Sequence, residues 1–237
     1  MTNLDFGRFH ALTFDCYGTL IDWERGLLDA FQPLLAAHDL ELTPDGLLER
    51  YARHEAALEA GPYLRYRDVV AASAQGVCAE LGADASGADL AAFADAVGDW
   101  PAFGDSAAAL RRLATRFRLG VITNCDDDLF ARSSRRLGVR FDWVITAQQS
   151  GAYKPARPSF DLAFERIDVP RDRILHVAQS LFHDHVPAKA LGLTTAWIDR
   201  RAGRPGSGAT PPATAAPDLV APDMRTFAAL ALGDPAA

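Results

Sequence analysis

The sequence predicts a doubly wound α/β fold with a parallel sheet and a helical cap inserted after the first strand. Three observations favour this fold. Short apolar runs alternate with stretches of helical periodicity in the second half of the chain, which indicates parallel strands joined by right-handed crossovers. An all-helical block separates the first apolar run from the others. The 237 residues are enough for one catalytic domain with a sizeable insertion.

The first strand and the helical block come first in the chain. The apolar run 11–14 predicts a buried strand, and a helix is expected over 23–38. Thr43 and Pro44 form a cap and a first-turn proline, which predict a second helix that Gly61-Pro62 ends. Further helices are expected over 63–81 and 88–99. The predicted domains are an α/β catalytic core of residues 1–21 and 101–237 and a helical cap domain of residues 22–100.

Beyond residue 100 the predicted strands and helices alternate. Strands are expected over 119–123, 143–145, 174–178 and 195–198, and helices over 127–137, 159–167 and 187–191. The segment 201–217 is rich in Gly, Pro, Ala and Thr, which is typical of a surface loop. A last short strand and a helix over 222–232 follow it. This order predicts a Rossmann-like core.

The composition is that of a folded, soluble protein. Hydrophobic residues make up 49% of the chain and charged residues 23%. The net charge of −7 provides no basic surface, so nucleic acid and membrane are not expected as partners. Three widely separated cysteines favour free thiols in a reducing compartment. A polar stretch follows Met1 and no apolar run reaches roughly 18 residues, so we expect neither a signal peptide nor a membrane span. A cytoplasmic location is expected.

Polar side chains follow four of the predicted strands. The clusters are Asp15-Tyr17-Thr19, Thr123-Asn124, Tyr153-Lys154, and Ser180 to Asp184. Ligands of an open parallel sheet bind at the carboxyl ends of its strands, so these clusters are expected to converge on one site.

The residue types indicate nucleophilic chemistry. Asp15 is a carboxylate at a strand end, suited to form a covalent ester, although a carboxylate that caps a turn is the alternative. Lys154 would keep Asp15 ionised and stabilise developing charge. Hydrogen-bonding groups at Thr19, Thr123, Asn124 and Ser180 could hold a substrate carboxylate or the nucleophile.

These motifs resemble those of a known superfamily. The matching segments are Phe14-Asp15-x-Tyr17-Gly18-Thr19-Leu20, Ile122-Thr123-Asn124, Tyr153-Lys154-Pro155, and the strand and loop 176–189. In this order, with a helical insertion after the first strand, they resemble the haloacid dehalogenase superfamily and, within it, the L-2-haloacid dehalogenases. The resemblance implies hydrolysis of a small 2-haloalkanoic acid to a 2-hydroxy acid through an aspartyl ester on Asp15.

Tyr17 decides between two chemistries of the superfamily. Its phosphatases have a second aspartate at this position, which protonates the leaving alkoxide and contributes about 10²–10⁴-fold to the rate. Halide leaves as a stable anion without a proton, so Tyr17 favours dehalogenation. The resemblance also implies that Asp184 helps to activate the hydrolytic water. Phe160 stands where the dehalogenases tend to have tyrosine, and Gln179, Ser180 and Leu181 differ from their pattern before Asp184.

A cap arginine is expected to bind the substrate carboxylate or the leaving halide, again by resemblance. Arg50 and Arg53 lie one helical turn apart and could share a face; Arg53 is the favoured of the two, and a solvated surface position is the competing and favoured interpretation of either. Trp23, Tyr63 and Tyr66 are candidates for an aromatic lid, although packing in the core or at an interface is the favoured role. The run Asp126, Asp127 and Asp128 is interpreted as the capping of a helix start.

No cofactor is expected for dehalogenation. His183 and His185 beside Asp184 suggest a metal only weakly, because neighbouring side chains on an irregular loop need not converge. The alternative function is a small-molecule phosphatase with magnesium held by Asp15 and Asp184. A noncatalytic relative that binds a small acid, or hydrolysis of a strained ring amine, also remains open. The expected partner is a small-molecule substrate, and a homodimer formed through the cap would fit the family.

Overall fold

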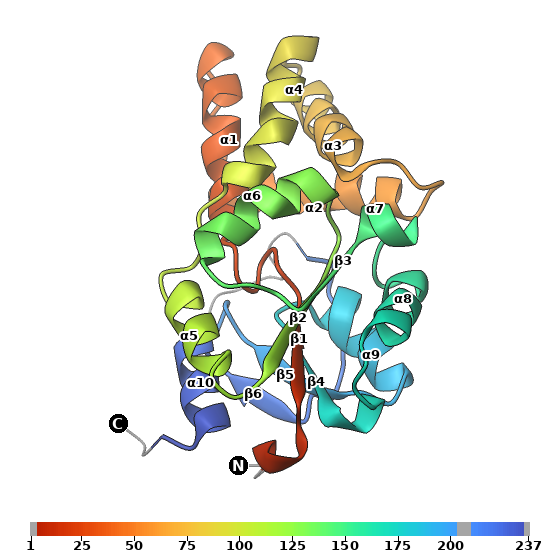
Figure 1. The fold of residues 1–237 in the computed structure, drawn as a ribbon. Helices are drawn as coiled ribbons and strands as arrows, with labels where there is room; N and C mark the ends of the chain where they lie inside the picture. Colours follow the sequence, from red (N-terminus) through yellow and green to blue (C-terminus); the bar gives the residue numbers. More distant parts are fainter. Residues whose placement is uncertain (1–3, 203–209, 235–237) are drawn as a thin grey trace.

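A computed structural model describes residues 4–202 and 210–234 and shows a parallel sheet between layers of helices (Figure 1). All five strand pairings in the six-stranded sheet are parallel, with strand order β3-β2-β1-β4-β5-β6. The strands are β1 Ala11–Phe14, β2 Arg118–Thr123, β3 Trp143–Thr146, β4 Ile174–Ala178, β5 Thr194–Ile198 and β6 Leu219–Ala221. The predicted doubly wound α/β fold is confirmed.

Strand β1 lies at the centre of the sheet, where the strand order reverses. Its four residues are all buried, as expected for a strand covered on both faces. Phe14 pairs with Val121 of β2 on one side and with Val177 of β4 on the other. Ligands of such sheets bind at the carboxyl ends of the strands beside this reversal. The next residue, Asp15, therefore emerges at the position where the fold favours a site.

Two helical layers cover the sheet. The core helices are α5 Ser106–Leu113, α6 Asp127–Leu137, α7 Ala147–Ser150, α8 Pro158–Arg166, α9 Val186–Ala190 and α10 Met224–Leu232. Short turns are η1 Phe6–Arg8, η3 Arg171–Arg173 and the π-type turn η4 Leu181–His185. In Figure 1, α5 and α10 lie on one side of the sheet and α8 and α9 on the other. The alternation of β1 follows this division, since Leu12 and Phe14 belong to one core cluster and Ala11 to the second.

The helical insertion lies beyond the carboxyl ends of the strands (Figure 1). It consists of α1 Trp23–Ala37, α2 Pro44–Glu59, α3 Tyr66–Glu80, α4 Gly87–Asp95 and η2 Ala96–Asp99. Its interior contains Phe31, whose ring centroid is 4.5 Å from that of Phe93 and 6.1 Å from that of Tyr51. The domain boundary at residues 22 and 100 stays a prediction, although these helices occupy that block.

Helix α3 begins three residues later than the periodicity predicts, because a core residue caps it. Both carboxylate oxygens of Asp126 accept a backbone hydrogen bond at 3.1 Å, one from Tyr66 and one from Arg67. Asp126 makes no side-chain cap on α6, the helix that follows it in sequence. Asp126 therefore caps the start of a helix, as predicted, but the helix is α3 of the insertion and not α6. These two hydrogen bonds connect the insertion to the core.

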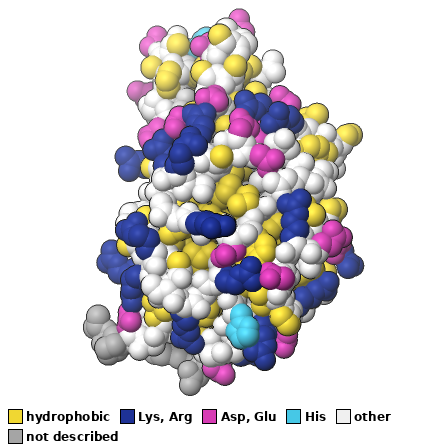
Figure 2. Space-filling view, viewed as in Figure 1, with side chains coloured by type: hydrophobic (Ala, Val, Ile, Leu, Met, Phe, Trp, Pro, Cys, Tyr) yellow, Lys and Arg dark blue, Asp and Glu magenta, His cyan; other side chains and the backbone are white. Residues whose placement is uncertain are grey.

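The rest of the surface agrees with an acidic protein of mixed charge. Basic and acidic side chains are interspersed over the face in Figure 2. None of the described helices combines the length and apolar character needed to cross a bilayer. Residues 203–209 of the predicted 201–217 loop lie outside the described residues.

Gly26 allows helix α1 to lie against Trp100 at the end of the insertion. A Cβ atom at Gly26 would overlap the indole ring of Trp100, whereas a Cβ at Gly87 in α4 would meet no atom within 4 Å. We therefore expect Gly26→Ala to lower the free energy of unfolding by about 1–3 kcal/mol, the usual range for overpacking. Urea denaturation of the wild type, Gly26→Ala and the control variant Gly87→Ala measures the difference. An unchanged midpoint for Gly26→Ala, or an equal loss in the control Gly87→Ala, would contradict the expectation.

Candidate active site

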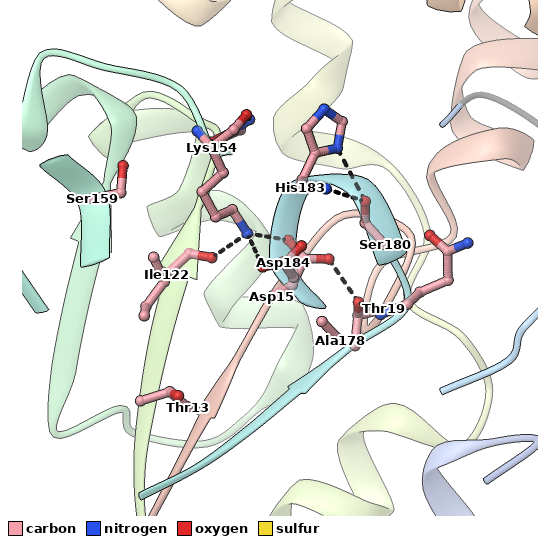
Figure 3. A network of polar contacts seen from close by, with 12 residues as sticks. Thr13, Asp15, Thr19, Ile122, Lys154, Ser159, Ala178, Ser180, His183 and Asp184 are labelled. Carbon is pink, nitrogen blue, oxygen red and sulfur yellow. Dashed lines mark hydrogen bonds and ion pairs between the residues drawn. The ribbon is translucent and has the colours of Figure 1, made fainter. Parts of the chain in front are cut away.

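Asp15 is held as a buried carboxylate with a defined partner on each oxygen. Lys154 Nζ donates to its Oδ1 at 2.9 Å, and Thr19 Oγ1 donates to its Oδ2 at 2.6 Å (Figure 3). The backbone N–H of Asp15 bonds to the carbonyl of Val177 at 3.1 Å, which keeps the residue in line with the sheet. Only 6% of Asp15 is exposed to solvent. The arrangement presents an oriented, largely desolvated carboxylate.

A tight turn returns Thr19 to the carboxylate that precedes it. Gly18 has φ +89°, a left-handed conformation that a residue with Cβ rarely adopts. The carbonyl of Cys16 then accepts from the N–H groups of Thr19 and Leu20 at 3.2 and 2.7 Å. Thr19 Oγ1 also accepts from the backbone N–H of Gln179 at 2.9 Å. Thr19 therefore connects the end of β1 to the segment that follows β4.

The Lys154 ammonium is the centre of the site (Figure 3). Its three protons have three acceptors, Asp15 Oδ1 at 2.9 Å, Asp184 Oδ1 at 2.6 Å and the carbonyl of Ile122 at 2.8 Å. Asn124 holds the backbone of Lys154, because its Oδ1 accepts from the Lys154 N–H at 2.7 Å and its Nδ2 donates to the carbonyl at 3.0 Å. Asn124 thus positions the lysine, besides lining the cavity.

Asp184 is fully buried and lies opposite Asp15. Its Oδ1 contacts His176 Nε2 at 3.0 Å in addition to Lys154, and Thr13 Oγ1 contacts the other ring nitrogen of His176 at 3.0 Å. A neutral His176 that donates to Asp184 must accept from the Thr13 hydroxyl. The second oxygen of Asp184 has no hydrogen-bond partner among the described residues. It can accept a hydrogen bond from water.

Two carboxylates, Asp15 and Asp184, share the single positive charge of Lys154, and the pKa values of the three groups reflect this. Burial alone would raise the pKa of Asp184, but Lys154 and His176 hold it below its usual range. Burial raises the pKa of Asp15, and Lys154 lowers it by less than burial and the charge of Asp184 raise it. The pKa of Lys154 lies above its ordinary value because its two carboxylate partners outweigh burial. One ammonium therefore stabilises Asp184 more fully than Asp15, and the pair titrates in two steps.

Tyr17 lines the cavity with its hydroxyl already engaged. The hydroxyl lies 3.0 Å from Ser133 Oγ and accepts from Cys125 Sγ at 3.3 Å. Its ring packs edge-on against Trp100, with centroids 5.9 Å apart. Burial raises the pKa of Tyr17 well above its usual value. The phenol is therefore neutral and directed to the protein, so it is a poor proton donor for a leaving group.

The insertion contributes two buried carboxyl groups to a cavity of about 30 Å³ around Asp15. Glu55 accepts hydrogen bonds from the hydroxyls of Tyr51 at 3.2 Å and Tyr66 at 3.0 Å. Burial raises the pKa of Glu55 to about 7. Glu59 lies 3.8 Å from His183 Nε2 and 3.5 Å from Asn124 Nδ2, and burial followed by the charge of Glu55 raises its pKa well above normal.

The predicted cap arginines do not reach this cavity. Arg50 and Arg53 do share a face of α2, but both bind Glu80 of α3, at 3.1 and 3.3 Å. The side chain of Arg53 is 58% exposed and also donates to the carbonyl of Glu49 at 3.3 Å. The placement of Arg53 beside the substrate was wrong, because the cross-helix ion pair with Glu80 turns it outward.

The remaining predicted residues lie around the cavity. Thr123 and Ser180 both line it. The Thr123 hydroxyl is buried without a hydrogen-bond partner among the described residues, so it can donate to a ligand. Ser180 Oγ accepts from the backbone N–H of His183 at 2.9 Å and begins the turn η4. The ring of Phe160 packs edge-on against His176, with centroids 5.5 Å apart. Phe160 therefore supports the histidine that contacts Asp184.

Trp23 and Tyr66, two of the predicted lid residues, line the cavity, whereas Tyr63 lies outside its lining. No group of three His, Cys, Asp or Glu side chains in 4–202 and 210–234 has metal-binding geometry. His185 instead contacts the carbonyl of Ala178 at 3.0 Å. Asp15 and Asp184 remain the two residues that would hold magnesium, but both share their Oδ1 atoms with Lys154. The donor set fits an ammonium better than a divalent cation, whose charge Lys154 would repel.

The sequence prediction missed Glu55, Glu59 and the pair His176 and Thr13. A signal for the first two was present in the spacing: Tyr51, Glu55 and Glu59 are four residues apart and share one face of a helix. His176 lies in an apolar strand, where an isolated polar residue indicates a buried partner.

Comparison with known proteins agrees with this geometry. A family model described as haloacid dehalogenase-like hydrolase matches residues 9–190. The chain belongs to the haloacid dehalogenase-like hydrolase family. The curated (S)-2-haloacid dehalogenase of Pseudomonas putida is 28% identical over 208 residues, which are 81% of this chain and 86% of that protein. This hydrolase is therefore similar to that dehalogenase over most of both chains.

Two further relatives of this haloacid dehalogenase-like hydrolase differ in extent. The 5-amino-6-(5-phospho-D-ribitylamino)uracil phosphatase of Escherichia coli (strain K12) is 35% identical over 91 residues, 38% of this chain and 36% of that protein. The solved L-2-haloacid dehalogenase from Xanthobacter autotrophicus is 21% identical with a TM-score of 0.79, over 96% of this chain and 100% of that chain. The structural likeness extends the shared fold to the helical insertion.

The buried Glu55 of this hydrolase makes its stability depend on pH. Its folded pKa of about 7 lies above its ordinary value of 4.5, so its contribution to stability is fully present below pH 4.5 and is lost as the pH rises through 7. We expect the wild type to lose about 3 kcal/mol relative to Glu55→Gln between pH 4.5 and 8. Urea denaturation across this range measures the difference. Glu49→Gln, an exposed change on the same helix, is the control, and parallel pH profiles for wild type and Glu55→Gln would contradict the assignment.

Proposed function

We propose that this protein hydrolyses the carbon–halogen bond of a 2-haloalkanoic acid and releases a 2-hydroxy acid, with Asp15 as the nucleophile. The observation that carries this proposal is the pairing of an oriented Asp15 with the occupied hydroxyl of Tyr17 two residues later. A nucleophile whose neighbour two residues later supplies no proton favours a leaving group that departs as a stable anion. The named activity of the similar Pseudomonas putida protein agrees with this choice.

In the first step, a carboxylate oxygen of Asp15 attacks the carbon that bears the halogen. The new carbon–oxygen bond forms as the carbon–halogen bond breaks, and the halide leaves with the bonding electron pair. The two hydrogen bonds from Lys154 and Thr19 fix the direction of the carboxylate. The small volume of the cavity, about 30 Å³, limits the number of water molecules around the nucleophile. The Thr123 hydroxyl can donate to the carboxylate of the substrate.

In the second step, water attacks the carboxyl carbon of the Asp15 ester. The unpartnered oxygen of Asp184 accepts a hydrogen bond from this water and takes its proton as the attack proceeds. The Lys154 ammonium stabilises the negative charge that develops on the ester oxygen. As the intermediate collapses, the bond between the carboxyl carbon of Asp15 and the substrate oxygen breaks, and this oxygen takes the second proton of the attacking water. This releases the 2-hydroxy acid and restores the Asp15 carboxylate, and the proton on Asp184 passes to solvent. The sum is one haloacid and one water giving one hydroxy acid, one halide and one proton.

A magnesium-dependent phosphatase that uses the same Asp15 is the second candidate. The raised pKa of Glu59 favours it, because a protonated carboxyl in the cavity could supply the proton that Tyr17 does not. Halide release from chloro-, bromo- and fluoroacetate and both 2-chloropropionates, beside phosphate release from an aryl phosphate, separates the two. Each assay is run with magnesium and with a chelator. Halide release that resists the chelator supports dehalogenation, whereas phosphate release alone would replace it, and no turnover of any compound would favour a noncatalytic role.

Asp15→Asn is expected to lower halide release by at least about 10⁴-fold, because the amide is a very weak nucleophile. Circular dichroism and thermal denaturation should show an intact fold. The exposed change Asp172→Asn, at the opposite end of the sheet, is the control. With the wild type in excess over substrate, a single turnover in H₂¹⁸O should place ¹⁸O in Asp15 and leave the 2-hydroxy acid unlabelled. Label in the product of the first turnover would refute the ester.

Tyr17→Phe is expected to retain halide release within about three-fold, because a halide needs no proton and the ring keeps its packing against Trp100. Steady-state kinetics with 2-chloropropionate provide the measurement. A loss of about 10²-fold or more with an unchanged KM would show that the hydroxyl takes part in the chemical step.

A further inference from the structure

A larger cleft opens directly beside the catalytic cavity. It lies between the end of helix α2 with its following loop and the core segments around Tyr153 and the turn η4, and its volume is about 510 Å³. Three residues, Glu59, Lys154 and His183, line both spaces. The cleft is therefore an extension of the site that contains Asp15.

The two spaces differ greatly in size. The inner cavity of about 30 Å³ accommodates only two or three water-sized groups, since a water needs roughly 10–15 Å³. It can hold a reacting carbon and its leaving group. The outer cleft of about 510 Å³ falls in the range of roughly 300–1,000 Å³ that is typical of small-molecule sites. Hydrogen or methyl on the reacting carbon would leave it unfilled.

The walls of the outer cleft are mainly aromatic and aliphatic. Tyr63 and Tyr153 pack against each other with ring centroids 5.4 Å apart, and the Tyr153 hydroxyl donates to the carbonyl of Leu64 at 2.8 Å. Phe182 of the turn η4 also lines the cleft, and Ala56 of α2 and Ala60, the residue that follows α2, contribute methyl groups. These fixed rings favour an apolar or aromatic ligand.

The polar groups of the cleft are concentrated at its junction with the inner cavity. Among the described residues that line it, the acidic and basic side chains are the three that it shares with the inner cavity. At this junction Glu59 lies 3.8 Å from His183, and the Phe182 ring packs edge-on against His183 with centroids 5.0 Å apart. A ligand that spans the junction would place its polar head at Asp15 and its apolar body among the rings.

We infer that the outer cleft binds the side chain of the substrate, so that the preferred 2-halo acid carries an aromatic or bulky apolar group on its reacting carbon. This inference rests on the proposed function. The reacting carbon and the halogen occupy the inner cavity, the carboxylate lies at its junction with the cleft, and the body lies between Tyr153, Phe182 and Ala56. Such a substrate excludes water from the junction more fully than haloacetate does.

Binding of the product acids tests the cleft independently of turnover. Calorimetric titration with 3-phenyllactate and with lactate compares two 2-hydroxy acids that differ only in the phenyl ring. We expect at least about ten-fold tighter binding of 3-phenyllactate to the wild type, from burial of the ring. Ala56→Phe, which fills the cleft, should remove this preference. Ala57→Phe adds the same ring on the exposed side of α2 and should leave it intact.

Equal affinities for the two acids, no binding of 3-phenyllactate, or equal effects of the two variants would overturn the inference. Halide release from 2-chloro-3-phenylpropionate and 2-chloropropionate is measured in parallel. Release from the second compound with no preference for the first would leave the proposed function standing without the cleft. A preference for 3-phenyllactate with no halide release would support the cleft and overturn the proposed reaction.

Discussion

The site depends on one buried positive charge. The Lys154 ammonium joins three segments of the sheet, because its acceptors are the carbonyl of Ile122 in β2, Asp15 after β1 and Asp184 after β4. Without this ammonium, two carboxylates would be buried with no compensating charge, which typically costs several kcal/mol. In the proposed reaction, the same ion orients the Asp15 carboxylate and stabilises the charge that forms during ester hydrolysis. Structure and chemistry therefore share a single group.

The surroundings of Lys154 are built to hold it. Asn124 bonds both backbone groups of Lys154, and His176 bonds the carboxylate of Asp184 on the far side. Thr13 then fixes His176, so the order extends from the centre of β1 to the reacting atoms. Thr19 closes the arrangement through the backbone of Gln179. Each of these hydrogen bonds fixes the orientation of a residue that makes the next bond, so the network maintains the geometry of the small cavity.

The core part of this site could be predicted because strand ends in a parallel sheet converge. Asp15, Thr123, Lys154 and Asp184 each follow an apolar run, and the sheet brings them together. The insertion part could not be predicted in this way, because spacing along a helix does not say which face packs inward. Arg53 turns toward Glu80, 27 residues later in the chain, and only tertiary structure reveals this partner.

The acidic residues of the insertion were missed for a related reason. A glutamate near the end of a helix is usually solvated, and the tyrosines that bury Glu55 come from two different helices. Asp126 is similar, since it caps the helix of another segment rather than its own. Local sequence predicts a local contact, whereas Glu55 bonds to a second helix of the insertion and Asp126 bonds across the boundary between insertion and core.

The net charge of the cavity depends on how many of the carboxyl groups from the core and from the insertion are protonated. Asp15, Asp184 and Lys154 together carry one net negative charge when all three are ionised. Ionisation of Glu55 and Glu59 would add two more negative charges within the same small space, which is unfavourable for burial and for an anionic substrate. Burial raises both pKa values, so these two carboxyl groups hold a proton to higher pH than an exposed glutamate does, and each can donate a hydrogen bond when protonated. In that form the insertion can offer an anionic ligand hydrogen bonds from neutral carboxyl groups, where the sequence suggested an arginine.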